Sequence, residues 1–226
     1  DVVCASSSAR KLGVVKHMSP AAATALLAPA GGRLVHAYWR DWPGPRTWYG
    51  PYQKASRELF TAIAATVEEV CGRATIERAS IDEGYIEVGT DAAFAAGSAD
   101  VLSLAEQLAA VLPAAVRAAT GLPVSCGVAH NKLLAKLAST HAKAVDLLSG
   151  AGARVFVVRG EADTEMLLGS CAATRIPGLG GHGEALRRLG IESATELRRL
   201  SIVDLKAELG LGQSAAEAAH ARCRGV

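Results

Sequence analysis

The stretch Ala79-Ser-Ile-Asp-Glu-Gly-Tyr-Ile-Glu-Val88 decides the fold and the chemistry expected of this chain. Its apolar residues predict extended structure, and two neighbouring acids, Asp82 and Glu83, interrupt that pattern at its centre. Successive side chains of a strand point to opposite faces, so both carboxylates can point the same way only if the backbone turns there. Gly84 permits such a turn or a bulge.

Paired carboxylates in an otherwise apolar strand indicate a bound cation, because they are costly to remove from water without one. Two Mg²⁺ ions, typically about 3.5–4 Å apart in two-metal sites, would neutralise them and organise phosphoryl transfer. One ion would activate the attacking hydroxyl and the other would hold the leaving phosphates. The alternative, from these residues alone, is a common solvated Asp-Glu turn between two strands.

Five motifs, in the same order along the chain, resemble those of Y-family translesion DNA polymerases. The palm motif at residues 77–85, Glu-Arg-Ala-Ser-Ile-Asp-Glu-Gly-Tyr, looks most like polymerase eta. The resemblance covers essentially the whole chain. The other motifs are Ser8-Ala-Arg-Lys-Leu-Gly-Val14 with Met18 (fingers), Tyr52-Gln-Lys-Ala-Ser56 (end of the fingers), Ser125-Cys-Gly-Val-Ala-His-Asn-Lys-Leu-Leu-Ala-Lys-Leu-Ala138 (second palm signature), and Ile176-Pro-Gly-Leu-Gly180 with Cys223-Arg-Gly225 (thumb).

The fold that this resemblance implies is α+β, a polymerase right-hand core. It has a palm sheet with packed helices, a small fingers domain and a helical thumb with a helix-hairpin-helix. The expected domains are residues 1–52 (fingers, with the end of the first palm segment), 53–160 (palm) and 161–226 (thumb). The pattern of elements also predicts α+β, since mixed strands and helices precede an all-helical end.

Apolar periodicity and turn residues predict the individual elements. Helices are expected at residues 20–27 (started by Ser19 and Pro20), 52–70, 103–120 and 131–143. Strands are expected at residues 33–38, 75–88 (two strands or a bent one), 123–128 and 154–158. Residues 39–51, which hold three Trp and three Pro, predict an irregular loop.

The resemblance assigns roles to single residues. It implies that Asp82 and Glu83 bind the two catalytic Mg²⁺ ions, with Mn²⁺ as an alternative. It implies that Arg10 contacts the triphosphate of the incoming nucleotide, since a planar guanidinium fork matches phosphate oxygens. The further nucleotide-binding candidates are Lys16, Tyr52 and Lys143.

Each nucleotide-site candidate also has a structural alternative. Arg10 and Lys16 can be surface residues, Tyr52 can serve core packing, and Lys143 can be a solvated lysine favoured by a helix C-terminus. The family usually has Pro after this lysine, whereas the chain has Ala144. Residues 130–132 are expected to be structural: His130 as packing, Asn131 and Lys132 as residues that cap and shape the helix.

The fingers motif departs from the family at its first position. The family usually has Tyr-Glu-Ala-Arg, and this chain has Ser7-Ser8-Ala9-Arg10. The shorter Ser7 replaces a hydroxyl that would help hold the triphosphate. We therefore expect weaker nucleotide binding than in relatives that keep the Tyr.

The segment Thr174-Arg-Ile-Pro-Gly-Leu-Gly-Gly-His-Gly-Glu-Ala-Leu186 predicts a helix end, a Gly-rich turn and a new helix. It resembles a helix-hairpin-helix, which holds the DNA backbone without reading sequence. Glycines would let backbone amides approach a phosphate closely. The alternative is a plain helical hairpin. The DNA-binding candidates are Gly178, Gly180, Gly181, Arg187 and Arg188, with Arg198 and Arg199 as weaker ones.

Charge is unevenly spread over a chain whose net charge is only +2. Residues 1–56 carry seven Lys/Arg against two Asp/Glu, residues 57–174 carry nine against fourteen, and residues 175–226 carry eight against six. An acidic middle between basic ends suits a metal-holding centre flanked by phosphate-contacting parts. Ordinary surface variation explains the same distribution equally well.

The expected compartment and partners follow from simple features. Five widely spaced cysteines without a Cys-x-x-Cys pair favour a reducing compartment over a disulfide framework or zinc site. Neither a leader nor an uninterrupted apolar run of membrane-spanning length is present, so we expect a soluble intracellular protein without a membrane. The resemblance to eta implies a nuclear location. It also implies primer-template DNA, deoxynucleoside triphosphates and, through regions absent here, a sliding clamp as partners.

Two family features are missing from the sequence. Family members begin with a strand that carries an Asp beside an aromatic pair, and Asp1 lies too close to Arg10 to match it. The little finger that would follow Gly225 is absent too. We therefore expect a fragment with little activity of its own. The alternatives are a degenerate polymerase-like DNA-binding protein, a palm-fold nucleotide cyclase, and the kappa-like, iota-like and deoxycytidyl-transferase branches.

Overall fold

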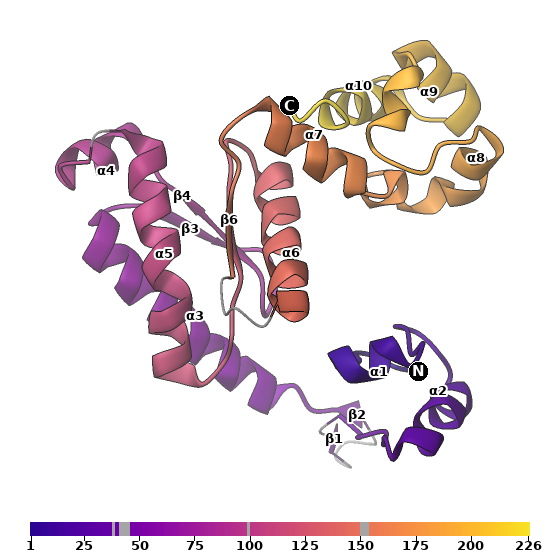
Figure 1. The fold of residues 1–226 in the computed structure, drawn as a ribbon, viewed down its shortest axis with the longest axis horizontal. Coiled ribbons are helices and arrows are strands. Elements are labelled where there is room, and N and C mark those ends of the chain that lie inside the picture. The colour runs from indigo at the N-terminus through magenta and orange to yellow at the C-terminus, as the bar shows by residue number, and fades with distance from the viewer. Residues whose placement is uncertain (38, 41–45, 99, 150–153) are drawn as a thin grey trace. The chain divides into compact units, whose positions relative to one another are not determined.

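The computed structural model describes residues 1–37, 39–40, 46–98, 100–149 and 154–226 (Figure 1). The chain divides into two compact units, Asp1–Gln53 and Lys54–Val226, each with its own core. Helices dominate both units, and strands are few and short. The expected α+β class is confirmed.

The first unit is built on two short helices, α1 (Ser7–Lys11) and α2 (Pro20–Leu27), followed by a 3₁₀ turn at Ala28–Ala30. The predicted start of α2 is confirmed. The Ser19 side chain accepts a hydrogen bond from the amide of Ala22, and Pro20 is the first helical residue. The buried core of this unit comprises Val2, Val14, Ala23 and Leu27.

A short antiparallel hairpin, β1 (Trp39–Arg40) with β2 (Arg46–Thr47), follows in the chain. The strand predicted at residues 33–38 is wrong over residues 33–37, which form neither helix nor strand; residue 38 lies outside the described part. Val35 is 90% exposed, and an extended segment without burial or a partner strand gains nothing from strand structure. The loop predicted at residues 39–51 instead contains this hairpin and the start of the next helix; residues 41–45 are not described.

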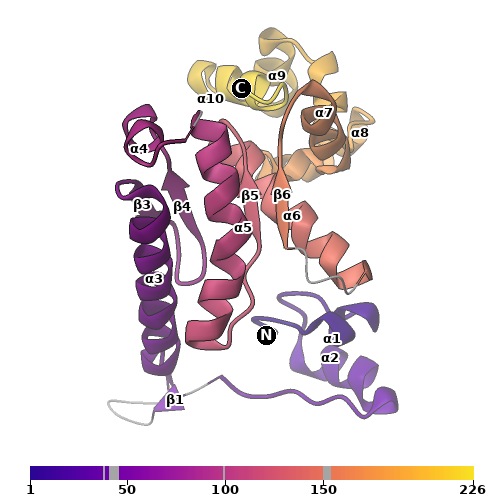
Figure 2. The ribbon, with the colours of Figure 1, turned by 60° about the vertical axis from the view of Figure 1, so that its left-hand side comes forward.

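The second unit opens with a mixed arrangement of helices and strands (Figure 2). The β3–β4 pair is an antiparallel hairpin, and β5 and β6 run parallel with α6 as the crossover between them. The elements in order are α3 (Gly50–Cys71), β3 (Thr75–Arg78), β4 (Gly84–Glu87), α4 (Thr90–Ala95), α5 (Val101–Thr120), β5 (Cys126–Val128), α6 (Lys132–Ser149) and β6 (Val155–Val157).

The β3–β4 hairpin has one face for the core and one for solvent and α6. The cross-strand pair Ile76 and Ile86 packs against the apolar clusters of α3 and α5. Side chains alternate along a strand, so the next pair, Glu77 and Tyr85, faces the other way. Figure 2 shows α3 and α5 beside this hairpin, and α6 beside β5 and β6.

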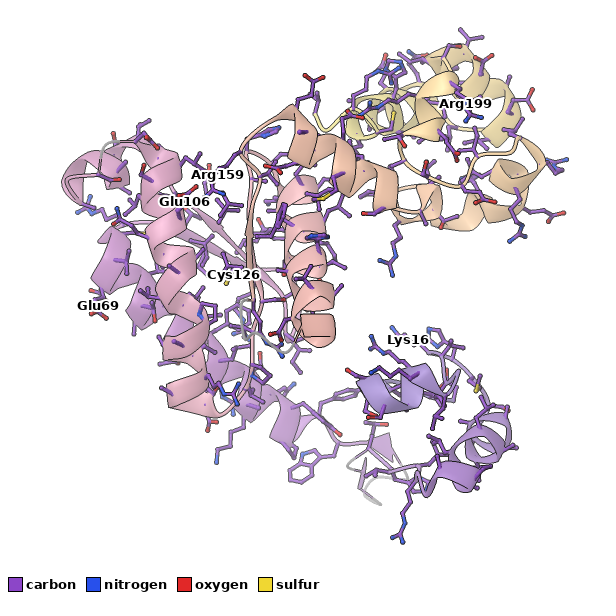
Figure 3. The ribbon with its side chains drawn as sticks, in the orientation of Figure 1. Lys16, Glu69, Glu106, Cys126, Arg159 and Arg199 are labelled. Atoms are coloured by element: carbon purple, nitrogen blue, oxygen red, sulfur yellow. The ribbon has the colours of Figure 1, made fainter. Side chains whose placement is uncertain are left out.

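Helix α5 is long and apolar enough to cross a membrane by length and composition alone. Its burial points to a different role. Leu104, Leu108, Leu112 and Val116 recur every four residues and are all buried in the protein core. Glu106 on the same helix forms an ion pair with Arg159 at 3.0 Å, between α5 and the residues after β6 (Figure 3). We therefore describe α5 as a core helix.

Helix α6 packs unusually closely on β5. A Cβ at Gly127 would lie only 2.1 Å from the carbonyl oxygen of Ala135, so only glycine fits there. The hydroxyls of Ser125 and Ser139 lie 3.1 Å apart across the same contact. This close packing fixes the face that α6 presents outward.

Residues 161–226 are all helical, as expected. Their apolar core also includes Leu134 of α6, so the helical end packs on the preceding part of the unit. The elements are α7 (Glu161–Ser170), α8 (Gly183–Arg188), α9 (Ile202–Leu209) and α10 (Gln213–Arg222), with 3₁₀ turns at Ala173–Arg175, Gly180–His182 and Glu196–Arg199.

Candidate active site at the β3–β4 turn

Asp82 and Glu83 lie in the turn that joins β3 to β4. The amides of Ala79 and Ser80 both donate to the carbonyl oxygen of Glu83 at 3.0 Å, which closes the turn. The prediction that the backbone turns at the acidic pair is confirmed. Both acids are exposed, however, so the expectation that they are removed from water within an apolar strand is wrong, and the alternative of an exposed Asp-Glu turn between two strands describes their position. The case for a cation therefore rests on the donor chemistry of the two carboxylates rather than on desolvation.

Ser80 organises this turn. Its hydroxyl donates to Oδ1 of Asp82 at 2.8 Å and accepts from the amides of Asp82 and Glu83 at 3.3 and 3.1 Å. Such local side-chain bonds are typical of serine two residues before a turn amide. The sequence prediction gave Ser80 no role, although a serine two residues before an acid was the available signal.

Gly84 is required by close packing rather than by a bulge. It pairs regularly with Arg78 in the hairpin. A Cβ at Gly84 would lie 2.8 Å from Cε1 of Phe60 and 3.1 Å from the carbonyl oxygen of Glu77. The guanidinium of Arg78 lies 4.3 Å from the Phe60 ring centroid and donates to Oγ of Ser56 at 2.8 Å. Phe60 and Arg78 thus hold the hairpin immediately beside the acidic turn.

Two lysines of α6 reach the acidic face of the hairpin. Nζ of Lys136 lies 2.9 Å from Oε2 of Glu83, and Nζ of Lys132 lies 2.5 Å from Oε2 of Glu77. Hydrogen bonds to these carboxylates raise the pKa of both lysines. Exposed ion pairs contribute little to stability, so these contacts matter for the charge they bring beside the turn. The sequence prediction gave Lys136 no role and Lys132 only a helix-shaping one.

A cavity of about 540 Å³ opens beside this contact. Lys132, Lys136 and Thr140 recur every four residues and so share one face of α6, which forms one wall. That spacing was the sequence signal that could have identified the lysines. The lining residues are Tyr85 of β4, Lys132, Leu133, Lys136, Leu137 and Thr140 of α6, and Arg175, Pro177 and Arg222 of the helical end.

The acidic pair fits Mg²⁺ by the chemistry of its donors. Mg²⁺ is usually held by one or two carboxylates, with waters and substrate phosphates completing its shell. Asp82 and Glu83 provide those two carboxylates on adjacent residues. In the described ranges, no cluster of three or more His, Cys, Asp or Glu residues could hold a metal. Remaining ligands would therefore be water and phosphate oxygens.

Three of the nucleotide-site candidates belong to the first unit. Arg10 is exposed in the last turn of α1, and its Nε donates to the carbonyl oxygen of Ala5 at 3.1 Å. Lys16 is exposed between α1 and α2 (Figure 3). Tyr52 lies in the first turns of α3, with its ring centroid 6.2 Å from that of Tyr49. The role of these residues at one nucleotide site with Lys143 stays a prediction.

Lys143 is exposed on α6. The expectation that the helix ends there is wrong, because α6 continues to Ser149. Ala144 propagates the helix, whereas a proline at this position would have broken it. Asn131 caps the start as expected, since its Oδ1 accepts from the amide of Leu134 at 2.9 Å.

The helical end carries the predicted DNA-binding residues on its surface. The turn occurs as predicted, but a 3₁₀ turn rather than an α-helix precedes it. Gly178 has a φ of +93°, which favours glycine. Arg198 donates to both carboxylate oxygens of Glu165 and to the carbonyl of Cys223, so its role is structural rather than phosphate contact. The exposed candidates are Gly178, Gly180, Gly181, Arg187 and Arg188.

Solved structures with the same arrangement define the class of fold. The insertion ternary complex of Dbh DNA polymerase matches 98% of this chain and 55% of its own, with a TM-score of 0.62 and 23% identity. DinB from Sulfolobus solfataricus matches 97% of this chain and 55% of its own, with a TM-score of 0.65 and 22% identity. The fold is that of a polymerase core.

The family follows from sequence comparison. Residues 1–140 match the impB/mucB/samB family, and the chain belongs to this family of Y-family DNA polymerases. The palm-fold cyclase alternative is thereby set aside.

Curated relatives are DNA polymerase IV proteins. That of Methanoculleus marisnigri is 33% identical over 72% of this chain and 41% of its own length. That of Gluconobacter oxydans is 31% identical over 68% of this chain and 39% of its own length. The chain therefore spans about two fifths of the relatives it matches. These relatives support neither the eta branch nor the nuclear location expected from residues 77–83.

Proposed function

We propose that this chain forms the nucleotidyl-transfer core of a DNA-directed DNA polymerase that copies damaged templates. One observation carries the proposal: two adjacent carboxylates on a braced, exposed turn lie beside a cavity lined by cations. Family membership and relatives named DNA polymerase IV support it. Two structural neighbours are ternary complexes of Dbh, in keeping with DNA and a nucleotide as substrates.

The proposed mechanism assigns Asp82 and Glu83 to two Mg²⁺ ions, with Mn²⁺ as an alternative. When bound, such ions make the attacking hydroxyl more acidic and neutralise charge on the phosphates. The residues around the turn position the carboxylates, since the Ser80 hydroxyl donates a hydrogen bond to Asp82. Lys136 supplies positive charge beside Glu83. The residues proposed to bind the incoming deoxynucleoside triphosphate are Arg10, Lys16, Tyr52 and Lys143.

The proposed domain roles keep residues 1–52 as fingers, 53–160 as palm and 161–226 as thumb. The thumb would hold the DNA backbone, since exposed backbone amides and arginines contact phosphates without reading sequence. A sliding clamp is a further partner expected from the family, without an assigned site in this chain. The proposed backbone contacts are Gly178, Gly180, Gly181, Arg187 and Arg188.

Primer extension across a template thymine dimer tests the proposed activity. The Asp82→Ala, Glu83→Ala double variant should extend primers roughly 10²–10³-fold more slowly, because metal ions supply several kcal/mol of transition-state stabilisation. It should bind primer-template DNA as the wild type does. Glu87→Gln, an exposed acid on the same hairpin, is the matched control and should retain activity. Equal extension by the double variant and the wild type would refute the assignment.

A DNA-binding protein without chemistry is the second candidate. This candidate is favoured because the described residues contain no cluster of three or more His, Cys, Asp or Glu that could hold a metal. Only the two carboxylates of Asp82 and Glu83 are proposed as ligands. Mn²⁺ titration followed by electron paramagnetic resonance separates the candidates. The catalytic proposal expects Mn²⁺ binding that disappears in Asp82→Ala, Glu83→Ala. DNA binding without Mn²⁺ binding or extension would favour the second candidate.

A further inference from the structure

We propose that Arg175 and Arg222 bind a backbone phosphate of the DNA strand that is extended at Asp82 and Glu83. The cavity beside α6 is then a phosphodiester subsite that adjoins the glycine turn at residues 178–181. This inference rests on the proposed function.

The basic residues that line the cavity differ in whether they form ion pairs with carboxylates. Lys132 and Lys136 on the α6 wall are already paired with Glu77 and Glu83. Arg175 and Arg222 line the cavity from the helical end, and within the part of the chain that the structure describes neither makes a salt bridge. Their positive charge is therefore uncompensated locally. A guanidinium fork matches phosphate oxygens in geometry as well as charge.

The arginine wall is held in place by hydrogen bonds. Nη1 of Arg222 donates to the carbonyl oxygen of Pro177 at 3.0 Å, which links α10 to the segment carrying Arg175. The carbonyl of Gly225, just after α10, lies 2.8 Å from Nδ2 of Asn131, a donor, and 3.1 Å from Nε2 of His130. The C-terminal end of α10 is thus tied to the start of α6. A fixed spacing between the two walls follows.

The length of the cavity favours a nucleic-acid strand over a single anion. Lys132, Lys136 and Thr140 are four residues apart, so these polar groups extend about 12 Å along α6. A phosphate ion cannot span that length, whereas a DNA strand carries one charge about every 3.4 Å of its axis. Lys136 touches Glu83, so the strand in this cavity runs toward the acidic turn.

The salt dependence of DNA binding tests the subsite. Affinity of the 226-residue chain for a fluorescent primer-template is measured by anisotropy at several salt concentrations. Arg175→Gln with Arg222→Gln should make the slope of log K against log[salt] shallower by about one unit, because one phosphate contact is lost. Arg73→Gln with Arg117→Gln, two exposed arginines on the α3 and α5 side, removes the same charge and should leave the slope unchanged. Arg222→Lys, which keeps the charge but not the guanidinium fork, should keep the wild-type slope and bind more weakly.

Neutral methylphosphonate linkages identify the ligand. Placed one at a time in the primer strand, one of them should weaken binding to the wild type and have no effect on the double variant. An equal loss in both proteins, or an unchanged slope in the double variant, would overturn the inference. Competition by a free nucleoside triphosphate at this position would also overturn it, because the ligand would then be the nucleotide.

The subsite and the proposed activity fail in distinguishable ways. Primer extension with an unchanged salt slope in Arg175→Gln, Arg222→Gln leaves the polymerase proposal standing and removes the subsite. A shallower slope in the arginine variant, with no Mn²⁺ binding to the wild type that depends on Asp82 and Glu83, keeps the subsite and removes the chemistry. Absence of any DNA binding by the wild-type chain would refute the subsite outright.

Discussion

Gly84 is the residue whose replacement should disturb the acidic turn most directly. A methyl group at this position would meet the Phe60 ring at 2.8 Å and a backbone carbonyl at 3.1 Å. Gly84→Ala should therefore destabilise the second unit by about 1–3 kcal/mol, the usual cost of overpacking. Urea unfolding followed by circular dichroism measures this free energy. The control is Gly89→Ala, where no atom lies within 4 Å of the added carbon.

The cause can be separated from a general intolerance of alanine. Adding Phe60→Leu to Gly84→Ala makes room for the methyl group and should recover part of the lost stability. If Gly84→Ala and Gly89→Ala cost the same, close packing on Phe60 is not the reason for the glycine.

For single residues, the sequence predicts which side chains form the candidate site better than it predicts their solvent exposure. Asp82 and Glu83 and the turn between the strands follow from local pattern alone. Their exposure does not, because it depends on which elements cover the hairpin. Lys136 was missed for the same reason: its partner Glu83 is 53 residues away, and only the folded chain brings the two together.

The N-terminus of α6 is capped by Asn131, which also bonds the segment after α10. Asn131 accepts from the amide of Leu134 and donates to the carbonyl of Gly225. Asn131→Ala should lose both bonds and cost about 1–3 kcal/mol, since a lost N-cap alone costs about 1 kcal/mol. Asn131→Ser keeps a capping oxygen but loses the donor to Gly225, so its cost should be smaller. Thermal unfolding compares the variants, and equal losses would show that the link to Gly225 contributes nothing.

Element prediction succeeds where helices carry their own start and stop signals. Helix α2 begins at Ser19-Pro20, and α5 ends at Gly121 with a left-handed φ of +73°, both as the sequence indicates. It fails where no signal exists. Helix α6 runs past Lys143 because Ala144 gives no reason to stop. The strand expected at residues 33–38 fails because strand structure needs a partner that local pattern cannot supply.

Over the whole molecule, charge is organised by contacts rather than by segments. The acidic middle of the sequence was expected to be a metal centre flanked by basic ends. In the second unit the acids of the hairpin are instead met by lysines of the same middle segment, through Lys132–Glu77 and Lys136–Glu83. At the cavity beside α6, the helical end contributes Arg175 and Arg222, which make no salt bridge with the described residues. The net charge of a segment therefore does not by itself predict phosphate contacts. Whether each cation is paired with a carboxylate in the folded chain must be known as well.

The free energy of unfolding should depend on pH in alkali through the thiol of Cys126. Burial raises the pKa of Cys126 on β5 from its ordinary 9.0 to about 11 (Figure 3). Above pH 9 the unfolded chain loses this proton while the folded protein keeps it, so stability is fully present below pH 9 and falls as pH approaches 11. The slope is about 1.4 kcal/mol per pH unit, or about 3 kcal/mol over the interval. Urea unfolding between pH 8 and about 11 measures it.

Two cysteine variants isolate this contribution from the other groups that titrate in alkali. Cys126→Ala removes the buried thiol, so its unfolding free energy should decline less steeply above pH 9 than that of the wild type. Any cavity left by the shorter side chain shifts the whole curve downward without changing this slope. Cys4→Ala removes an exposed thiol and should leave the wild-type slope. Parallel curves for Cys126→Ala and the wild type would mean that the Cys126 thiol ionises as readily in the folded protein as in the unfolded chain.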